Sequence, residues 1–231
     1  LSGVSAPTRT GYTVEGYYAE AGCTQKVADK EGVLQANVSG YTDADGAWTK
    51  GTGATLYAKW TANPHTLTWN FDGGESSLAA GVGYTAGGTV NYGTAITYPT
   101  NVSMTKTGYT FTGWSSSPAT MPDADLTITA LWTQNNYTLT MAANPADKGA
   151  NITSPRTGAG TVDNKHYGDA ITVTVTEPEH YTFTSWTSSN GGTFTNASDL
   201  STTFTMPDNA TTVTANFTEN AQFTVTWSDN G

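Results

Sequence analysis

One seven-residue phrase occurs three times in this 231-residue chain and constrains its fold more than any other feature. The phrase reads Gly-Tyr-Thr-Phe-Thr-Gly-Trp at 108–114, Gly-Tyr-Thr-Val-Glu-Gly-Tyr at 11–17 and His-Tyr-Thr-Phe-Thr-Ser-Trp at 180–186. Each copy is followed by an alternating segment that ends on an aromatic residue, at 55–60, 127–132 and 212–217. Two landmarks that recur in the same order indicate a tandem array of small units.

The spacing of these landmarks sets the boundaries of the units. His65 and Tyr137, which open equivalent strands, are 72 positions apart, and so are Tyr109 and Tyr181. We therefore divide the chain into repeat 1, repeat 2, repeat 3 and a terminal segment, at residues 1–62, 63–134, 135–219 and 220–231. Repeat 1 lacks an opening strand, and repeat 3 is longer and divergent. The terminal segment is predicted to be the first strand of a further repeat.

Period-2 alternation predicts that the units are built of strands. Apolar residues alternate with threonine or other polar residues at 66–71, 137–141, 171–176 and 223–227. One apolar face and one hydroxyl face are typical of an antiparallel sheet with one side in water. Helical periodicity is weak, and its best candidate is a short turn near 27–34. We expect a mainly β, β-rich α+β fold of small modules.

Turn signals separate the predicted strands. Tyr-Gly-Thr at 92–94 and Tyr-Gly-Asp at 167–169 precede a strand in repeats 2 and 3. Met-Pro-Asp at 121–123 and 206–208 stops the chain before the closing strand, where proline is tolerated at a strand boundary. The short connectors 61–64 and 133–136 leave little slack, so we expect an elongated, semi-rigid array.

The recurring aromatic residues are predicted to form the cores. A unit of this size buries a modest fraction of its surface, while one buried aromatic contributes on the order of 4–6 kcal/mol of gross transfer free energy. Trp114→Ala should therefore cost about 3–5 kcal/mol and unfold repeat 2. The predicted core aromatics are Tyr12, Tyr17, Trp60, Trp69, Tyr109, Trp114, Trp132, Tyr181, Trp186 and Phe217. The alternative makes these rings stacking platforms for sugars.

Aromatic residues that do not recur are better candidates for exposed ligand-binding residues. They are Trp48, Tyr41 and Tyr84. Isolated surface aromatics are common, however, and need no function.

The charge balance excludes some partners. Nine basic residues stand against nineteen acidic residues, for a net charge of −10. Nucleic acids and anionic membranes are therefore poor partners. No apolar run approaches the roughly 18–20 residues that cross a bilayer, so direct membrane insertion of this segment is not expected.

We find no catalytic or metal-binding pattern, and we expect neither an enzyme nor a cofactor. The histidines, His65, His166 and His180, are scattered and lack zinc-ligand spacing. Cys23 is the only cysteine, which excludes an intramolecular disulfide and leaves a loop residue or intermolecular pairing. Asp43-Ala-Asp-Gly begins like a calcium loop, but Ala47 and Ala54 stand at its next ligand positions. A turn explains that segment better.

The repeated phrase, the closing strand Leu-Tyr-Ala-Lys-Trp at 56–60 with its equivalents, and the Asp-Gly-Gly turn at 72–74 resemble the Listeria–Bacteroides repeat, also called the internalin B-repeat. Repeat 2 shows the signature most fully. In repeat 3, His180 and Ser185 replace two glycines and Phe217 replaces the final tryptophan. We expect a different turn geometry there. The resemblance implies β-grasp-like units in large extracellular bacterial proteins, with no catalytic residues.

These inferences predict a structural spacer or stalk segment of an extracellular, secreted or surface-displayed bacterial protein or filament. Its partners would be other repeats or neighbouring subunits. Exchange of the terminal strand 223–227 between chains could link such subunits. The favoured explanation of the two incomplete repeats is an arbitrary cut in a longer protein. The alternative function is an adhesin or a module that binds a surface glycan or protein through loops that the repeats do not share.

Overall fold

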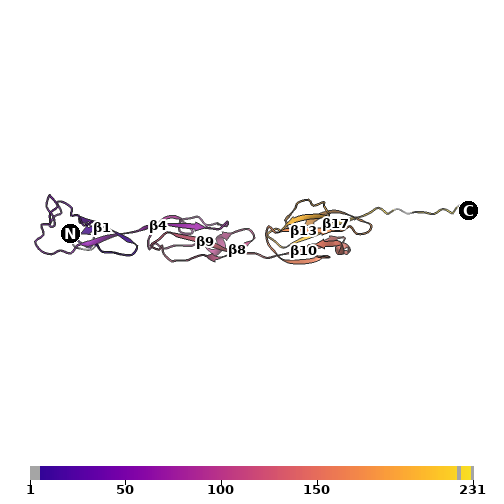
Figure 1. The fold of residues 1–231 in the computed structure, drawn as a ribbon, viewed down its shortest axis with the longest axis horizontal. Helices are drawn as coiled ribbons and strands as arrows, with labels where there is room; N and C mark the ends of the chain where they lie inside the picture. Colours follow the sequence, from indigo (N-terminus) through magenta and orange to yellow (C-terminus); the bar gives the residue numbers. More distant parts are fainter. Residues whose placement is uncertain (1–5, 223–224, 230–231) are drawn as a thin grey trace. The chain divides into compact units, whose positions relative to one another are not determined.

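The computed structural model describes residues 6–222 and 225–229 and is built almost entirely of strands (Figure 1). It contains two compact units. One holds the residues up to 104 together with 113–131, and the other holds 105–112 together with the residues from 132 onward. The boundary crosses repeat 2, because residues 105–112 of that repeat pack with repeat 3.

Repeat 1 is a three-stranded antiparallel sheet in the order β2-β1-β3. Its strands are β1 (Tyr12–Tyr18), β2 (Lys26–Asp29) and β3 (Tyr57–Ala62). The predicted helical turn at 27–34 is wrong. Strand β2 and a tight turn occupy this segment, because the Asp29 carboxylate accepts a hydrogen bond from the Val33 amide at 2.8 Å and Gly32 adopts a φ of 86°. These interactions reverse the chain and bridge Ala28 to Leu34.

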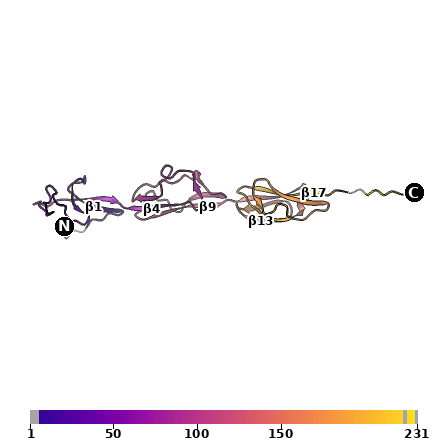
Figure 2. The ribbon, with the colours of Figure 1, turned by 90° about the horizontal axis from the view of Figure 1, so that it is seen from above.

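Repeat 2 contains a four-stranded mixed sheet in the order β6-β4-β9-β8. Its first strand, β4, pairs in parallel with its last strand, β9, while β6 runs antiparallel to β4. Figures 1 and 2 show β4 and β9 side by side. The elements are β4 (Pro64–Asn70), β5 (Glu75–Ser76), β6 (Gly88–Asn91), the 3-10 helix η1 (Asn101–Ser103), β7 (Met104–Thr105), β8 (Tyr109–Trp114) and β9 (Leu126–Gln134).

Repeat 3 has the same sheet, with the order β12-β10-β17-β14 and a parallel pair β10–β17. A second four-stranded sheet, β11-β13-β16-β15, accompanies it. The elements are β10 (Tyr137–Asn144), the 3-10 helix η2 (Ala146–Asn151), β11 (Ile152–Ser154), β12 (Gly160–Lys165), β13 (Ala170–Val175), β14 (Tyr181–Ser188), β15 (Thr193–Phe194), β16 (Ser201–Thr205) and β17 (Thr211–Glu219). The described residues form no α-helix, so the fold is mainly β.

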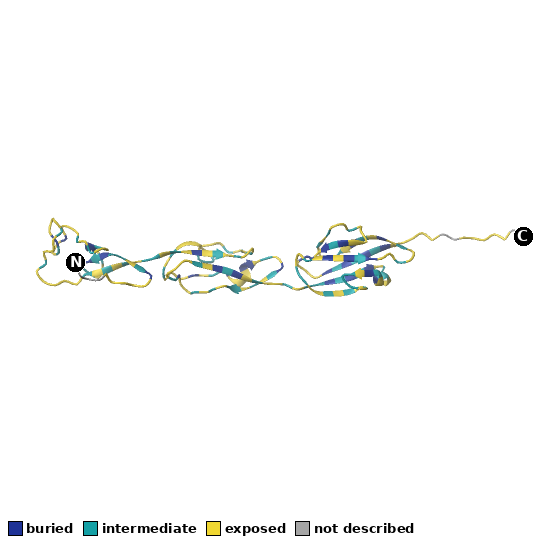
Figure 3. Ribbon diagram, in the orientation of Figure 1, coloured by how far each residue is buried: buried dark blue, intermediate teal, exposed yellow. Residues whose placement is uncertain are grey.

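The interiors of repeats 2 and 3 are filled differently (Figure 3). In repeat 3, alternate residues of both sheets meet in one cluster, which includes the fully buried Leu139, Val173 and Phe204. In repeat 2 the buried cluster has only four members, Leu67, Ile96, Met121 and Ile128. Partly buried aromatic rings, among them Trp69, Tyr98 and Trp114, pack against it.

The aromatic residues predicted to form the cores divide into three groups. Trp186 and Phe217 are buried, at 2% and 7% exposure. Trp69, Trp114 and Tyr181 are partly buried against a core cluster. The other five are half-buried and belong to neither cluster: Tyr12, Tyr17, Trp60, Tyr109 and Trp132. Of these, Tyr12 and Tyr109 are the first residues of β1 and β8, and each follows a tight turn at the end of its sheet.

Three of the four alternating segments form strands, namely β4, β10 and β13. The fourth, 223–227, falls partly on residues 223 and 224, which lie outside the described residues. Val225 and Trp227 are in no strand and are 73% and 92% exposed.

The divergent phrase of repeat 3 keeps the geometry of the other copies at its first replaced glycine, contrary to the expectation, whereas Ser185 does not adopt the positive φ of Gly16 and Gly113. His180 adopts a φ of 66°, beside 75° at Gly11 and 77° at Gly108. The pairing register shifts between Phe183 and Ser185, as it does between Val14 and Gly16 in repeat 1. The backbone hydrogen bonds around the turn therefore impose one conformation, and repeat 3 accommodates a histidine within it.

Candidate functional site at the joints between repeats

Each copy of the seven-residue phrase begins in a tight turn, which we call the tip. In the tip of repeat 1, the amide of Tyr12 donates to the carbonyl of Arg9 at 3.0 Å. The equivalent bonds run from Tyr109 to Lys106 at 3.0 Å and from Tyr181 to Pro178 at 3.1 Å. The third residue of each turn has positive φ, the conformation for which a type II turn normally requires glycine.

An asparagine closes each tip. The amide of Asn63 donates to the Gly11 carbonyl at 2.9 Å, and its side-chain oxygen accepts a hydrogen bond from the Thr13 hydroxyl at 2.7 Å. The same pair of bonds joins Asn135 to Gly108 and Thr110, and Asn220 to His180 and Thr182. We call this arrangement the asparagine clasp. It fixes the start of each connector to the tip of the repeat that precedes it.

A second turn is shared by repeats 2 and 3, and we call it the Tyr-Gly turn. The amide of Gly93 donates to the carbonyl of Met121, and the amide of Gly168 donates to that of Met206, both at 2.9 Å. The two methionines are fully or almost fully buried, at 0% and 1% exposure. The Met-Pro-Asp segment thus anchors the Tyr-Gly turn to the core and holds its tyrosine, Tyr92 or Tyr167, at a fixed place.

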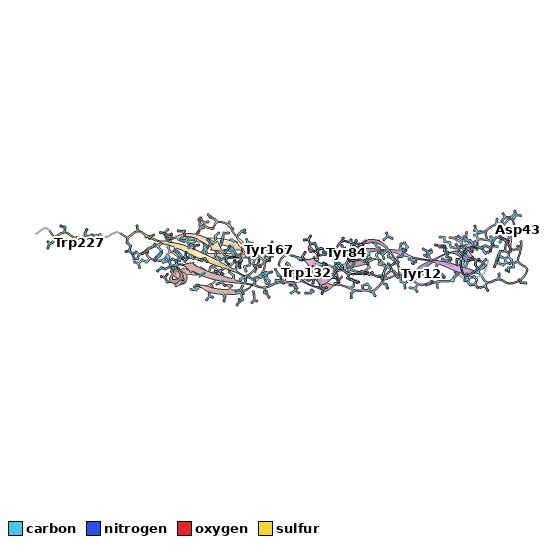
Figure 4. All side chains as sticks on the ribbon, turned by 180° about the vertical axis from the view of Figure 1, so that it is seen from behind. Tyr12, Asp43, Tyr84, Trp132, Tyr167 and Trp227 are labelled. Atoms are coloured by element: carbon cyan, nitrogen blue, oxygen red, sulfur yellow. The ribbon has the colours of Figure 1, made fainter. Side chains whose placement is uncertain are left out.

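The tip of one repeat receives the Tyr-Gly turn of the next. The Tyr92 ring lies directly against Gly11, and Tyr167 lies directly against Gly108. Both glycines are buried by this contact. Tyr92 also meets Tyr12 edge-on, with ring centroids 5.6 Å apart. Figure 4 labels Tyr12 and Tyr167, which take part in the first and the second joint.

Asp123 adds a polar network to the first joint. Its carboxylate accepts hydrogen bonds from the Gly11 amide at 3.0 Å and the Asn63 side chain at 3.1 Å, and it contacts His65 Nε2 at 2.9 Å. The hydrogen bond with His65, followed by that with Asn63, lowers the pKa of the Asp123 carboxyl below its ordinary value. The network therefore joins repeat 1 and repeat 2 best while Asp123 is ionised.

A groove of about 550 Å³ opens beside this first joint. Its lining includes Arg9, Tyr12, Lys30 and Trp60. The Arg9 guanidinium stands 3.8 Å from the centre of the Tyr12 ring, a cation–π contact that holds this side of the tip. Lys106 stands over Tyr109 in the same way at 4.5 Å in the second joint.

The candidate ligand-binding aromatics are placed in two regions. Tyr41 and Trp48 meet edge-on in a loop of repeat 1, with centroids 5.6 Å apart, and Trp48 is 37% exposed. Its indole N–H donates to the Lys50 carbonyl at 3.0 Å, which fixes the ring. Tyr84 is instead half-buried, because it packs edge-on against Trp69 at 5.6 Å in the aromatic cluster of repeat 2.

The described residues bring together no set of three metal-ligating side chains, and no described helix is long and apolar enough to cross a membrane. His166 and His180 each lie beside an acidic neighbour of their own, Asp169 and Glu179. Cys23 is a half-buried free thiol in a loop. Asp43, labelled in Figure 4, accepts hydrogen bonds from the Asp45 and Ala47 amides, as a turn residue does.

Two family models match the chain. One, described as the Listeria-Bacteroides repeat domain, matches residues 1–42 and 65–143, which is more than half of the sequence. The chain belongs to the Listeria–Bacteroides repeat family. The other model, described as the divergent InlB B-repeat domain, matches residues 137–221 and so covers repeat 3. Members of the Listeria–Bacteroides repeat family occur in bacterial surface or extracellular proteins.

Searches of curated proteins and of solved structures found no match to this chain of Listeria–Bacteroides repeats. Sequence reasoning identified the tips, the Tyr-Gly turns and the Met-Pro-Asp segments as landmarks, but it missed that they form the joints. One available signal was the recurrence of Tyr-Gly before a strand in repeats 2 and 3. A second was the recurrence of asparagine at positions 63, 135 and 220.

Proposed function

We propose that this segment is a spacer that carries tension in a bacterial surface or extracellular protein. The parallel pairing of the first and last strands of a repeat supports this function most directly. Because β4 and β9 run in the same direction, the chain enters repeat 2 at one end of the sheet and leaves it at the other. The pair β10–β17 arranges repeat 3 in the same way. Each repeat therefore adds the length of its sheet to the path of the chain.

The same pairing suits a segment under tension. A force that pulls on the two ends of such a repeat slides its first strand along its last strand. All the hydrogen bonds between the two strands are then loaded together, whereas a force across the end of a hairpin breaks them one after another. The ladder joins four residue pairs in repeat 2, from Leu67 with Leu126 to Asn70 with Thr129. In repeat 3 it joins six, from Leu139 with Thr211 to Asn144 with Asn216.

Single-molecule force spectroscopy tests this proposal. The chain is tethered through added tags at both ends, and repeat 3 is expected to unfold at a higher force than repeat 2 because its parallel ladder is longer. In the control, force is applied to repeat 3 through cysteines introduced at Asn136 and His166 in a Cys23→Ser background. These two positions flank one end of the antiparallel pair β10–β12, so the force separates the two strands from that end. This geometry should unfold repeat 3 at a much lower force. Equal unfolding forces in the two geometries would contradict the proposal that the spacer carries tension.

A second candidate function, binding of a surface glycan or protein, is favoured by the Tyr41–Trp48 pair. A ring that is already fixed by its own N–H bond loses little entropy when a ligand stacks on it. Trp48→Ala should abolish saturable binding on a glycan or protein array and leave the melting temperature unchanged. Tyr57→Ala, at a residue 41% exposed on β3, is the matched control and should keep binding. If no array component binds wild type, this candidate fails.

Strand exchange between chains stays a prediction, because residues 223 and 224 of the exchanging segment lie outside the described residues. Among the described strands, β3 pairs only with β1, so one of its edges is open to a further strand. Analytical ultracentrifugation at high concentration tests the exchange. A self-association that is lost on Val225→Pro would support it, and a chain that stays monomeric would refute it.

A further inference from the structure

We propose that the residue at the third position of the tip decides whether a repeat can dock a following repeat. A glycine there makes the tip a socket for the tyrosine of a Tyr-Gly turn. The third tip carries His180 at this position, and the socket of repeat 3 is closed to such a turn. The partner surface is thus the Tyr-Gly turn of another repeat of this family.

The two occupied sockets show why only glycine fits. A Cβ atom added to Gly11 would lie well inside 3.0 Å of the Tyr92 ring, and one added to Gly108 would lie equally close to Tyr167. Real Cβ atoms essentially never approach a heavy atom so closely. The tyrosines cannot retreat, because the bonds of Gly93 to Met121 and of Gly168 to Met206 fix their turns to buried methionines.

The third tip has the same backbone as the other two. His180 keeps the positive φ, and its carbonyl accepts the Asn220 amide at 2.8 Å, as the glycine carbonyls do in the other clasps. Its Cβ therefore occupies the position where the tyrosine side chain packs in the first two joints, the Tyr92 ring against Gly11 and the Tyr167 Cβ against Gly108. The side chain is 72% exposed and lies 3.3 Å from Glu179. The histidine keeps the turn and the clasp of its own repeat and alters what can approach the tip.

A second glycine of the phrase is also replaced in repeat 3, and its position shows that closure of the socket depends on the tip residue alone. Ser185 replaces the glycine found at positions 16 and 113. A Cβ added to Gly113 would meet no atom within 4 Å, and one added to Gly16 would meet only Lys26 and Ala28 of its own repeat. A side chain at this position therefore strains the positive φ of the glycine but touches no joint. The two replacements in one phrase differ in consequence, and only the replacement at the tip closes a docking surface.

The first joint offers the test, because both of its sides lie in one compact unit. Spin labels are attached to cysteines at Ser39 in repeat 1 and Thr89 in repeat 2, both exposed, in a Cys23→Ser background. Pulsed electron resonance then measures the distribution of the distance between the labels. We expect a narrow distribution with Gly11 and its loss in Gly11→His, with the same broadening as in Tyr92→Ala. Gly113→Ser is the matched control and should keep the narrow distribution.

Gly11→Asn separates closure of the socket from backbone strain, because asparagine tolerates positive φ better than most residues. It carries a Cβ and should broaden the distribution as histidine does. Thermal unfolding followed by circular dichroism shows that each variant is folded before its distances are compared. A narrow distribution in folded Gly11→His or Gly11→Asn would overturn the proposal, as would broadening in folded Gly113→Ser.

Discussion

Repeats 2 and 3 share a sheet with the same strand order, yet they stabilise it in different ways. In repeat 3 a second sheet covers the first, and aliphatic side chains such as Leu139 and Val173 interlock between the two. In repeat 2 the second layer shrinks to the two short strands β5 and β7, and aromatic rings cover the sheet instead. The sheet order therefore does not depend on one kind of core.

The comparison also shows that one landmark can have two structural roles. Trp114 and Trp186 occupy the same place in the repeated phrase. Trp186 is 2% exposed and its indole N–H donates to the Asp199 carbonyl at 3.0 Å. Trp114 is half-buried among the rings of Trp69, Phe71 and Tyr98. A tryptophan between two sheets is enclosed, whereas a tryptophan on a single sheet keeps one side open to water.

The largest expected effect follows from the enclosed tryptophan. Trp186→Ala removes a buried ring from between two sheets that cannot close the space, and it should cost about 3–5 kcal/mol of the free energy of unfolding of repeat 3. Denaturant unfolding followed by circular dichroism measures the loss. Trp227→Ala, at a residue 92% exposed, is the control and should leave the stability unchanged. A loss below about 1 kcal/mol would contradict the enclosed site.

Trp114→Ala should cost less, about 2 kcal/mol, because the removed ring was partly in water and the neighbouring rings can move into its place. This expectation revises the estimate for a fully buried tryptophan that the sequence alone suggested. The same denaturant experiment measures it in the unfolding transition of repeat 2. If both substitutions cost equal free energy, the difference between the two interiors has no energetic meaning.

His180→Gly should raise the stability of repeat 3 by up to about 1 kcal/mol. The histidine occupies a φ that costs an ordinary L-residue about 1–2 kcal/mol, and glycine removes this strain. Glycine also increases the conformational entropy of the unfolded chain, which offsets part of the stabilisation. The shift of the thermal midpoint gives the measurement. Gly108→His in repeat 2 should act in the opposite direction, and by more, because it also meets Tyr167. A fall in stability with His180→Gly would show that the histidine makes a favourable contact.

The smallest effect is expected at acid pH. Because the pKa of Asp123 is lowered in the folded chain, its contribution is present above the ordinary pKa, near 3.8, and is lost as the pH falls through the lower folded value. The contacts of Asp123 with Gly11, Asn63 and His65 should weaken below about pH 4. Nuclear magnetic resonance of the Gly11 amide against pH follows this loss. In Asp123→Asn the corresponding step should be absent, and a step that remains would assign it to another group.

The sequence predicted the strands β4, β10 and β13 correctly because one face of each strand is buried and the other is wet, which leaves a period of two in the pattern. It could not distinguish the interiors of the two repeats, because alternation shows that a face is covered but not what covers it. The helical turn predicted at 27–34 failed for a related reason. The bonds that Asp29 makes with Val33 decide that segment, and a periodicity cannot represent them.

Sequence reasoning missed the joints because their two halves lie far apart in the chain and the recurring landmarks were not paired across repeats. Gly11 and Tyr92 are separated by more than the length of a repeat, and no sequence pattern links one residue to the other. Glycine at the tip was explained by its turn alone, so the close approach of a ring was not needed to account for it. The turn geometry of His180 was mispredicted because its asparagine clasp, formed with Asn220, had not been recognised.

The order of the turns along the chain has a consequence for how such arrays can be lengthened. Within repeat 2 the Tyr-Gly turn comes before the tip. A duplicated copy of this repeat would therefore carry both the turn that docks on the preceding repeat and the tip that receives the following repeat. Copies could be added or removed between existing repeats without redesign of their neighbours. A single substitution of the tip glycine would end a series of repeats joined in this way, and the next repeat would then need a joint of a different kind.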